Sequence, residues 1–171
     1  MVGHIFVCGI HNLEYAINHI KPESLISIVQ ESHQPSQKIS SKVNKHLRIS
    51  VDDIVDKQIG KIIPTQKNVE ILLNFFEQIN SSKPIVIHCL AGISRSSACA
   101  LILRRTQTHI SDIDLVSKFR RIMPHAHPNK LLIKHADNLL NRKGKFLNSL
   151  KKHPSDSFNT LGPISLVPPL N

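Results

Sequence analysis

The sequence has 171 residues, a formal net charge of +10 and three cysteines, so it is long enough for one domain with its own hydrophobic core and needs no disulfide framework. Aromatic residues make up only 4% of it, with no tryptophan, which leaves few surfaces for stacked bases and disfavours nucleic acid as the main ligand. We expect one domain over residues 1–152 and a disordered tail over 153–171, where Pro, Ser, Asn and Gly mix without periodicity.

The hydrophobic pattern predicts strands and helices that alternate along the chain. Strands are predicted at residues 5–9, 25–29, 47–51 and 85–87, and helices at about 12–20, 64–80, 95–105, 111–123 and 130–140, with a polar connection at 31–45. This order predicts an α/β fold, with a short, mainly parallel sheet of about four to five strands flanked by helices. A ligand site is then expected at the carboxyl ends of the strands.

The most informative stretch joins the strand at 85–87 to the helix at 95–105. Cys89 and Arg95 lie at the two ends of a loop of small and apolar residues: Leu90, Ala91, Gly92, Ile93 and Ser94. A tight turn from a strand into a helix directs backbone N–H groups and the positive end of the helix dipole at one point, where an anion can bind. Arg95 can close this cradle with its planar guanidinium, and the same surroundings favour a thiolate at Cys89.

The sequence His88-Cys89-Leu90-Ala91-Gly92-Ile93-Ser94-Arg95-Ser96 resembles the signature loop of the protein tyrosine phosphatase superfamily, and most closely that of its compact dual-specificity branch. This resemblance implies that Cys89 is the nucleophile and forms a phosphocysteine. It also implies that Arg95 and the loop amides bind the phosphoryl group, that Ser96 assists the breakdown of the intermediate, and that His88 supports the loop.

A phosphatase of this kind also needs a general acid, because the departing oxygen requires a proton. Asp52 and Asp53 follow the strand at 47–51, and the dual-specificity branch carries its acid on a mobile loop after such a strand. The resemblance favours Asp53, which directly precedes an apolar residue. Asp52 is the first alternative and Asp56 the second.

Residues 121–129 resemble the segment in which this branch places an asparagine that braces the signature loop, and this implies such a role for Asn129. Asn129 is also well placed to cap the helix at 130–140. His125, His127 and His135 are accompanied by no carboxylate or thiolate at a familiar metal-ligand spacing, so we expect no metal. The implied chemistry needs no other cofactor.

The leading hypothesis is therefore a cysteine-dependent phosphatase that acts on phosphotyrosine in proteins, with phosphoserine and phosphothreonine as second choices. No lysine lies in the loop, unlike the loops of phosphoinositide phosphatases. Two other classes stay open: a rhodanese-type sulfurtransferase, which would need no general acid, and a non-catalytic phosphate-binding module, which would not need Cys, Arg and Asp together.

Two features concern the surroundings of the protein. The N-terminus lacks a basic signal-peptide region and no apolar run approaches the ~18 residues of a membrane span, so we expect a cytoplasmic protein without a membrane span. Residues 130–152 are rich in Lys and Arg. Such a basic surface attracts phosphorylated proteins, nucleic acids or anionic membranes, although it often serves only to keep a protein soluble.

Overall fold

The computed structural model describes residues 3–79, 82–155 and 160–170. Five strands form one sheet: β1 (Ile5–Gly9), β2 (Ser24–Ile28), β3 (Lys45–Ile49), β4 (Ile85–Cys89) and β5 (Ser165–Val167). Their order is β3-β2-β4-β1-β5, and every neighbouring pair is parallel except β1 with β5. The prediction of an α/β fold with a mainly parallel sheet is confirmed.

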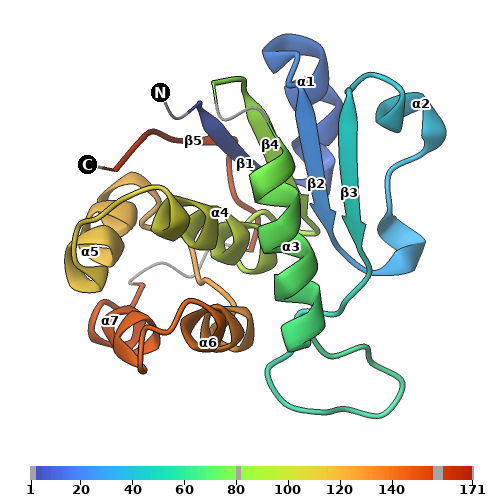
Figure 1. Cartoon of the computed structure of the whole chain (residues 1–171). Coiled ribbons are helices and arrows are strands. Elements are labelled where there is room, and N and C mark those ends of the chain that lie inside the picture. The colour runs from blue at the N-terminus through green and yellow to red at the C-terminus, as the bar shows by residue number, and fades with distance from the viewer. Residues whose placement is uncertain (1–2, 80–81, 156–159, 171) are drawn as a thin grey trace.

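The helices are distributed unequally over the two faces of the sheet (Figure 1). They are α1 (Ile10–Ile20), α2 (Gln37–Ser40), α3 (Gln66–Gln78), α4 (Arg95–Thr106), α5 (Asp112–Ile122), α6 (Lys130–Leu139) and α7 (Lys145–Lys152), with a 3-10 turn at Glu31–His33. Side chains alternate between the faces, as the period of a strand requires. Ile26 and Ile87 join the larger core beneath α3–α7, whereas Leu25 and Val86 pack with residues of α1.

The strand register brings the candidate loop beside the first strand. Gly9 is the partner of Cys89 at the carboxyl ends of β1 and β4, and Ser27 of β2 is the partner of His88. The strands β1, β2 and β4 are buried almost throughout. The site residues at this edge therefore lie at the ends of buried strands.

Two helix starts differ from the sequence prediction. α1 begins directly after β1 with Gly9 at its N-cap position, because the chain turns from the strand into the helix without a loop, so Asn12 lies inside the helix. α3 is capped by Thr65, whose side chain accepts from the backbone N–H of Asn68. Pro64 precedes this cap and does not occupy the first turn.

The end of the chain also differs from the sequence prediction. Within residues 153–171, for which the sequence predicts a tail without packed elements, β5 pairs antiparallel with β1. Val167 and Leu170 are buried, and the Arg104 guanidinium donates to the carbonyl oxygens of Val167 and Gly3. A strand of three residues has too little periodicity to be recognised from sequence, and its stability comes from this edge of the sheet.

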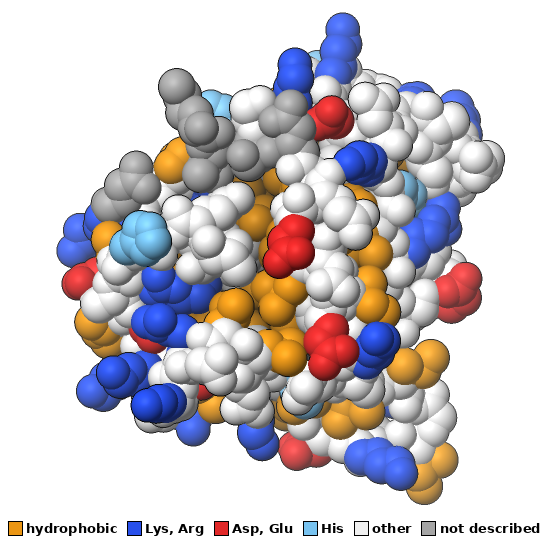
Figure 2. Space-filling model, viewed as in Figure 1, with side chains coloured by type: hydrophobic (Ala, Val, Ile, Leu, Met, Phe, Trp, Pro, Cys, Tyr) orange, Lys and Arg blue, Asp and Glu red, His pale blue; other side chains and the backbone are white. Residues whose placement is uncertain are grey.

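The surface carries the basic character expected from the sequence. Figure 2 shows Lys and Arg side chains gathered at the lower left, where α5–α7 lie in Figure 1. Asp137, the one acidic residue of the segment 130–152, is buried and accepts from the backbone N–H groups of Gly144 and Leu147 at the start of α7. Among the described residues, no helix has the length and apolar character that crossing a bilayer requires.

Candidate active site

The loop of residues 90–94 turns directly from β4 into α4. All five residues of β4 are buried, and α4 is buried over most of its length. Gly92 in the middle of the loop has φ of +77°, and a Cβ at this position would lie 2.4 Å from the backbone nitrogen of Gly9. Only glycine accommodates both the backbone conformation and this close approach. The loop is therefore pressed tightly against the end of β1.

The Cys89 thiol is held inside this loop. Its side chain is only 1% exposed, the Ser96 Oγ lies 3.1 Å from the Sγ, and the backbone N–H of Gly92 donates to the sulfur over 3.3 Å. Donors directed at sulfur stabilise its charged form. The sulfur is thus placed to act as a nucleophile toward a group bound in the loop.

The Arg95 guanidinium is buried behind the loop and is 2% exposed. Its Nη1 donates to the carbonyl oxygen of Val51 over 2.7 Å and to the Oε1 of Gln30 over 3.1 Å. The Nε, in contrast, is buried without a hydrogen-bond partner among the described residues. A buried, unpaired donor on a cation is costly. The Nε edge is therefore available to bind phosphoryl oxygens, and the other edge fixes its orientation.

Asp53 lies on the opposite side of the loop and is exposed. Its Oδ1 accepts from the Ser94 hydroxyl over 2.6 Å and from the Nδ2 of Asn129 over 2.9 Å. These contacts bring a carboxylate from the β3–α3 connection to the rim of the loop. A general acid needs this kind of position, within reach of an oxygen that leaves the bound group.

Asp52 and Asp56 are in different surroundings. The Asp52 Oδ2 accepts from the backbone N–H of Ile62 over 2.8 Å, and the Asp52 N–H donates to the carbonyl of Ile62 over 2.8 Å. These bonds close the base of the long loop that projects at the bottom of Figure 1. The bond from Ile62 lowers the pKa of Asp52, with help from the nearby Lys61. Asp52 thus stays ionised in a structural role, while Asp56 lines the adjacent cleft.

Asn129 joins three segments. Its Oδ1 accepts from the backbone N–H groups of Leu131 and Leu132, so it caps α6. Its Nδ2 donates to the Asp53 carboxylate and to the carbonyl of Ile54, and its backbone N–H donates to the carbonyl of Ser94. Asn129 therefore couples the start of α6 to both the loop and the candidate acid.

His88 supports the loop from inside the sheet. It is fully buried, its Nε2 lies 2.7 Å from the Ser27 Oγ, and its Nδ1 lies 3.3 Å from the carbonyl oxygen of Cys89. Burial lowers the pKa of His88 to about 4. The imidazole is consequently neutral near neutral pH.

A cleft of about 580 Å³ opens beside the loop. Ser94, Asp53 and Asn129 line it, together with the cationic side chains of Lys130 and Lys151. Ile93 is buried and Leu90 and Ala91 are half-buried. The loop residues are therefore small and mostly apolar, and the adjacent cleft contains cationic side chains.

The two remaining cysteines are core residues. Cys8 and Cys99 are free and buried. Burial raises the pKa of Cys8 to about 12 and also raises the pKa of Cys99. Both thiols stay protonated at neutral pH and behave as small core side chains.

Three contacts at the site are not predicted by the sequence analysis. Gln30 and the carbonyl of Val51 orient Arg95, and the backbone N–H of Gly162 donates to the carbonyl of Ala91 over 2.8 Å. Gln30 follows β2 at the edge of the sheet where the site lies, which is a signal that the sequence did contain. The contact of Gly162 had no such signal, because it depends on the position of β5.

Comparisons with known proteins show a family likeness in the sequence and a shared fold. A family model described as "Polymorphic toxin system, DSP-PTPase phosphatase" matches residues 25–107, which include the loop and the candidate acid. No curated protein matches the sequence.

Several solved structures have the same fold. DUSP15 is similar with a TM-score of 0.62 and 22% identity, over 90% of this chain and 94% of that chain. The human tyrosine phosphatase-like serine/threonine/tyrosine-interacting protein has a TM-score of 0.60 and 16% identity, over 81% and 92% of the two chains. PTPMT1 in complex with PI(5)P has a TM-score of 0.60 and 14% identity, over 81% and 94%.

Proposed function

Because a DSP-PTPase phosphatase family model matches residues 25–107, we propose that the chain is a phosphatase of the dual-specificity branch and hydrolyses phosphotyrosine in proteins through a phosphocysteine formed on Cys89. The observation that carries this proposal is the arrangement around the sulfur. Ser96 and the Gly92 N–H contact the Sγ, and the unpaired Nε of the buried Arg95 belongs to the same loop. This combination suits a tetrahedral, doubly charged group.

In the first step, the Cys89 sulfur attacks phosphorus and the bond between phosphorus and the tyrosyl oxygen breaks. Asp53 gives its proton to the departing oxygen, so that a neutral phenol leaves. Arg95 and the loop amides stabilise the charge on the equatorial oxygens of the transition state. The product is a covalent phosphocysteine.

In the second step, Asp53, now ionised, takes a proton from a water molecule as that water attacks the phosphocysteine. The phosphorus–sulfur bond breaks and the sulfur leaves as a thiolate. The Ser96 hydroxyl, 3.1 Å from the sulfur, stabilises this leaving group with a hydrogen bond. A role for both Ser96 and Asp53 favours a phosphatase over a sulfurtransferase, which needs neither.

The choice of substrate rests on the loop and the cleft. No cation lies among residues 90–94, whereas Lys130 and Lys151 line the cleft outside it. This distribution suits a phosphorylated side chain in the loop and acidic peptide residues further out. Phosphoserine and phosphothreonine are the second choice within the same proposal. The cytoplasm is the proposed location, since a reducing compartment keeps a nucleophilic thiol active.

The test is a panel of phosphorylated compounds at equal concentration. It contains peptides with phosphotyrosine, phosphoserine or phosphothreonine, the phosphoinositide PI(5)P, and a 5′-triphosphorylated RNA. We expect the phosphotyrosyl peptide to be turned over fastest, measured by release of inorganic phosphate. Faster turnover of PI(5)P or of the RNA would overturn the proposed substrate class, and turnover of none of them would overturn phosphatase activity itself.

A further inference from the structure

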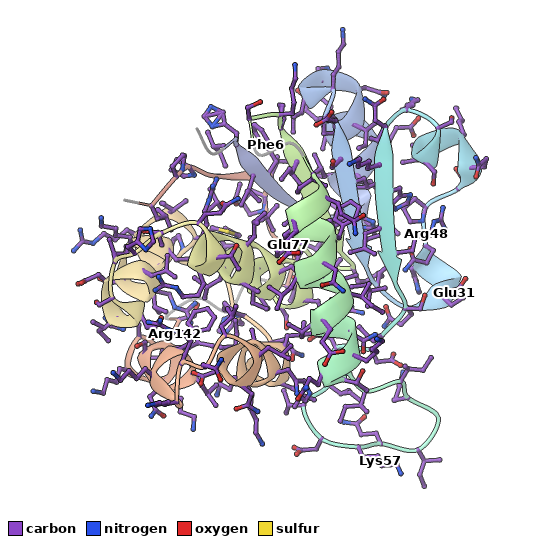
Figure 3. The ribbon with its side chains drawn as sticks, viewed as in Figure 1. Phe6, Glu31, Arg48, Lys57, Glu77 and Arg142 are labelled. Carbon is purple, nitrogen blue, oxygen red and sulfur yellow. The ribbon has the colours of Figure 1, made fainter. Side chains whose placement is uncertain are left out.

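A chain of hydrogen bonds leads from the sheet edge to the nucleophile. On β3, the Arg48 Nη2 donates to the Ser40 Oγ over 2.6 Å, and this oxygen lies 3.0 Å from the Nδ1 of His46. The Nε2 of His46 lies 2.7 Å from the Ser27 Oγ, which in turn lies 2.7 Å from the Nε2 of His88. Figure 3 labels Arg48 beside β3, on the far side of the sheet from α5–α7.

The residues at the His88 end of this series of hydrogen bonds are buried. Ser27 and His88 are fully buried on paired strands, and His46 is half-buried on the next strand. Burial lowers the pKa of His88 and His46 to about 4 in each case, and Arg48 contributes to the effect at His46. Both rings are therefore neutral at neutral pH, and each has one N–H donor and one acceptor nitrogen.

The groups at the two ends of the series determine the direction in which its hydrogen bonds donate. The carbonyl oxygen of Cys89 can only accept, so the His88 Nδ1 carries the proton that faces it, and the His88 Nε2 must accept from the Ser27 hydroxyl. Ser27 has then used its proton and accepts from the Nε2–H of His46. At the other end, the guanidinium of Arg48 can only donate.

The opposite direction of donation is disfavoured at the His88 Nδ1 and the Cys89 carbonyl oxygen. If the Ser40 hydroxyl donates to the carbonyl of Ser36, 3.2 Å away, the His46 Nδ1 becomes the protonated nitrogen. Every later bond then reverses, and the His88 Nδ1 faces the Cys89 carbonyl with a lone pair. Two acceptors opposed in a buried site are unfavourable.

We propose that Ser27 and His46 are positioning residues for the nucleophile, which hold His88 in the tautomer that donates to the Cys89 carbonyl. This carbonyl belongs to the same planar peptide as the N–H of Leu90, and the two groups point in opposite directions. Fixing the carbonyl toward His88 thus fixes the direction of one amide of the anion-binding loop. The inference rests on the proposed role of Cys89 and extends the site to β2 and β3.

The test uses a matched pair of serines on β2. Ser27→Ala removes the hydroxyl that joins the two histidines. Ser24→Ala removes an equally buried hydroxyl that has no partner within the described part of the chain. Two properties are measured: the dissociation constant of vanadate, by isothermal titration, and the tautomer of His88, from its ¹⁵N chemical shifts.

We expect Ser27→Ala to weaken vanadate binding about tenfold, because one amide of the loop loses its fixed direction, and to give a mixture of His88 tautomers. Ser24→Ala should leave both unchanged, and Ser27→Thr, which keeps a hydroxyl, should restore them. If Ser27→Ala does not fold, His46→Phe provides the same test, because it removes the donor to the Ser27 hydroxyl. An unchanged dissociation constant for vanadate, with a single Nδ1–H tautomer in the folded variant, would overturn the proposal.

Neither measurement requires turnover. The wild-type protein could show the Nδ1–H tautomer and Ser27→Ala the expected loss of vanadate affinity, while no phosphorylated compound is hydrolysed. This result would support the positioning role and contradict only the proposed function. The two proposals therefore fail separately.

Discussion

At the scale of single residues, the proposed mechanism assigns the reaction to Cys89 and the binding of the phosphoryl group to Arg95. We expect Cys89→Ser to abolish turnover while vanadate still binds, because Arg95 and the loop amides remain. Arg95→Ala should lose both activity and vanadate binding, since a charge-assisted contact disappears from a buried site. Isothermal titration with vanadate and a phosphate-release assay measure the two properties. Residual activity of even a few per cent in Cys89→Ser would contradict covalent catalysis.

The paired carboxylates at 52 and 53 give a second prediction at the residue scale. Asp53→Asn should slow the hydrolysis of phosphotyrosine about 100- to 10,000-fold but affect esters with good leaving groups much less, because only a poor leaving group needs the proton. The alkaline limb of the pH–rate profile should also flatten, since it reports the protonated acid. Rates with phosphotyrosine and with an activated aryl phosphate provide the comparison.

Asp52→Asn is the control for this experiment. Asp52 binds the backbone of Ile62 rather than the loop, so its replacement should leave the dependence on the leaving group intact. If Asp52→Asn changed that dependence and Asp53→Asn did not, the assignment of the acid would be wrong by one position. If neither variant changed that dependence, Asp56 would be tested next as the general acid.

At the scale of elements, β5 makes the end of the chain part of the fold. Val167 of β5 is fully buried, whereas its neighbour Leu166 is 43% exposed. Val167→Ala should therefore lower the free energy of unfolding by about 1–3 kcal/mol, through lost burial and a cavity, and lower Tm by several degrees. Leu166→Ala should change Tm by a degree or less. Calorimetry on both variants decides whether the strand is docked, because equal Tm values would contradict its packing.

The position of β5 also links stability to the site. Gly162 precedes the strand and donates to the Ala91 carbonyl of the loop, and a Cβ on Gly162 would lie 2.9 Å from the carbonyl oxygen of Gly92. The final segment thus supports the outer side of the loop, opposite the support that His88 gives from within the sheet. A loop held from two sides keeps its amides in place without a bound anion.

At the scale of the whole molecule, the buried histidines make stability depend on pH. An unfolded chain binds protons at its histidines below about pH 6.5, whereas burial lowers the pKa of His88 in the folded protein to about 4. Between these two pH values the unfolded state binds more protons. The contribution of His88 to the free energy of unfolding is therefore fully present above pH 6.5 and is lost as the pH falls toward 4. The loss from His88 alone is as much as about 3 kcal/mol.

This pH dependence can be measured by urea unfolding at pH 7, 6 and 5. The midpoint should fall steadily over this range, and His88→Gln should make the fall less steep even if that variant is less stable at every pH. His109→Gln, which changes an exposed histidine, should keep the wild-type slope. A wild-type midpoint that is constant from pH 7 to pH 5 would show that His88 is not buried as a neutral ring.

The sequence by itself determined the central part of this protein. The residues from His88 to Ser96 are contiguous, and the apolar runs on either side specify a buried strand and a buried helix. The loop between them is therefore local in origin, and its likeness to the phosphatase signature could be recognised without a structure. The alternation of strands and helices likewise determined the α/β class, since hydrophobic period is a property of the chain alone.

The tertiary structure decided which distant residues meet at this loop. Two adjacent carboxylates look equivalent in sequence, and only the closing of the loop by Ile62 turns Asp52 inward and leaves Asp53 facing Ser94 and Asn129. The approach of Ser27 to both His46 and His88 depends on the register of three strands, and β5 depends on an open edge of β1. These contacts join residues far apart in the chain, so they exist only once the sheet has formed, and no local pattern encodes them.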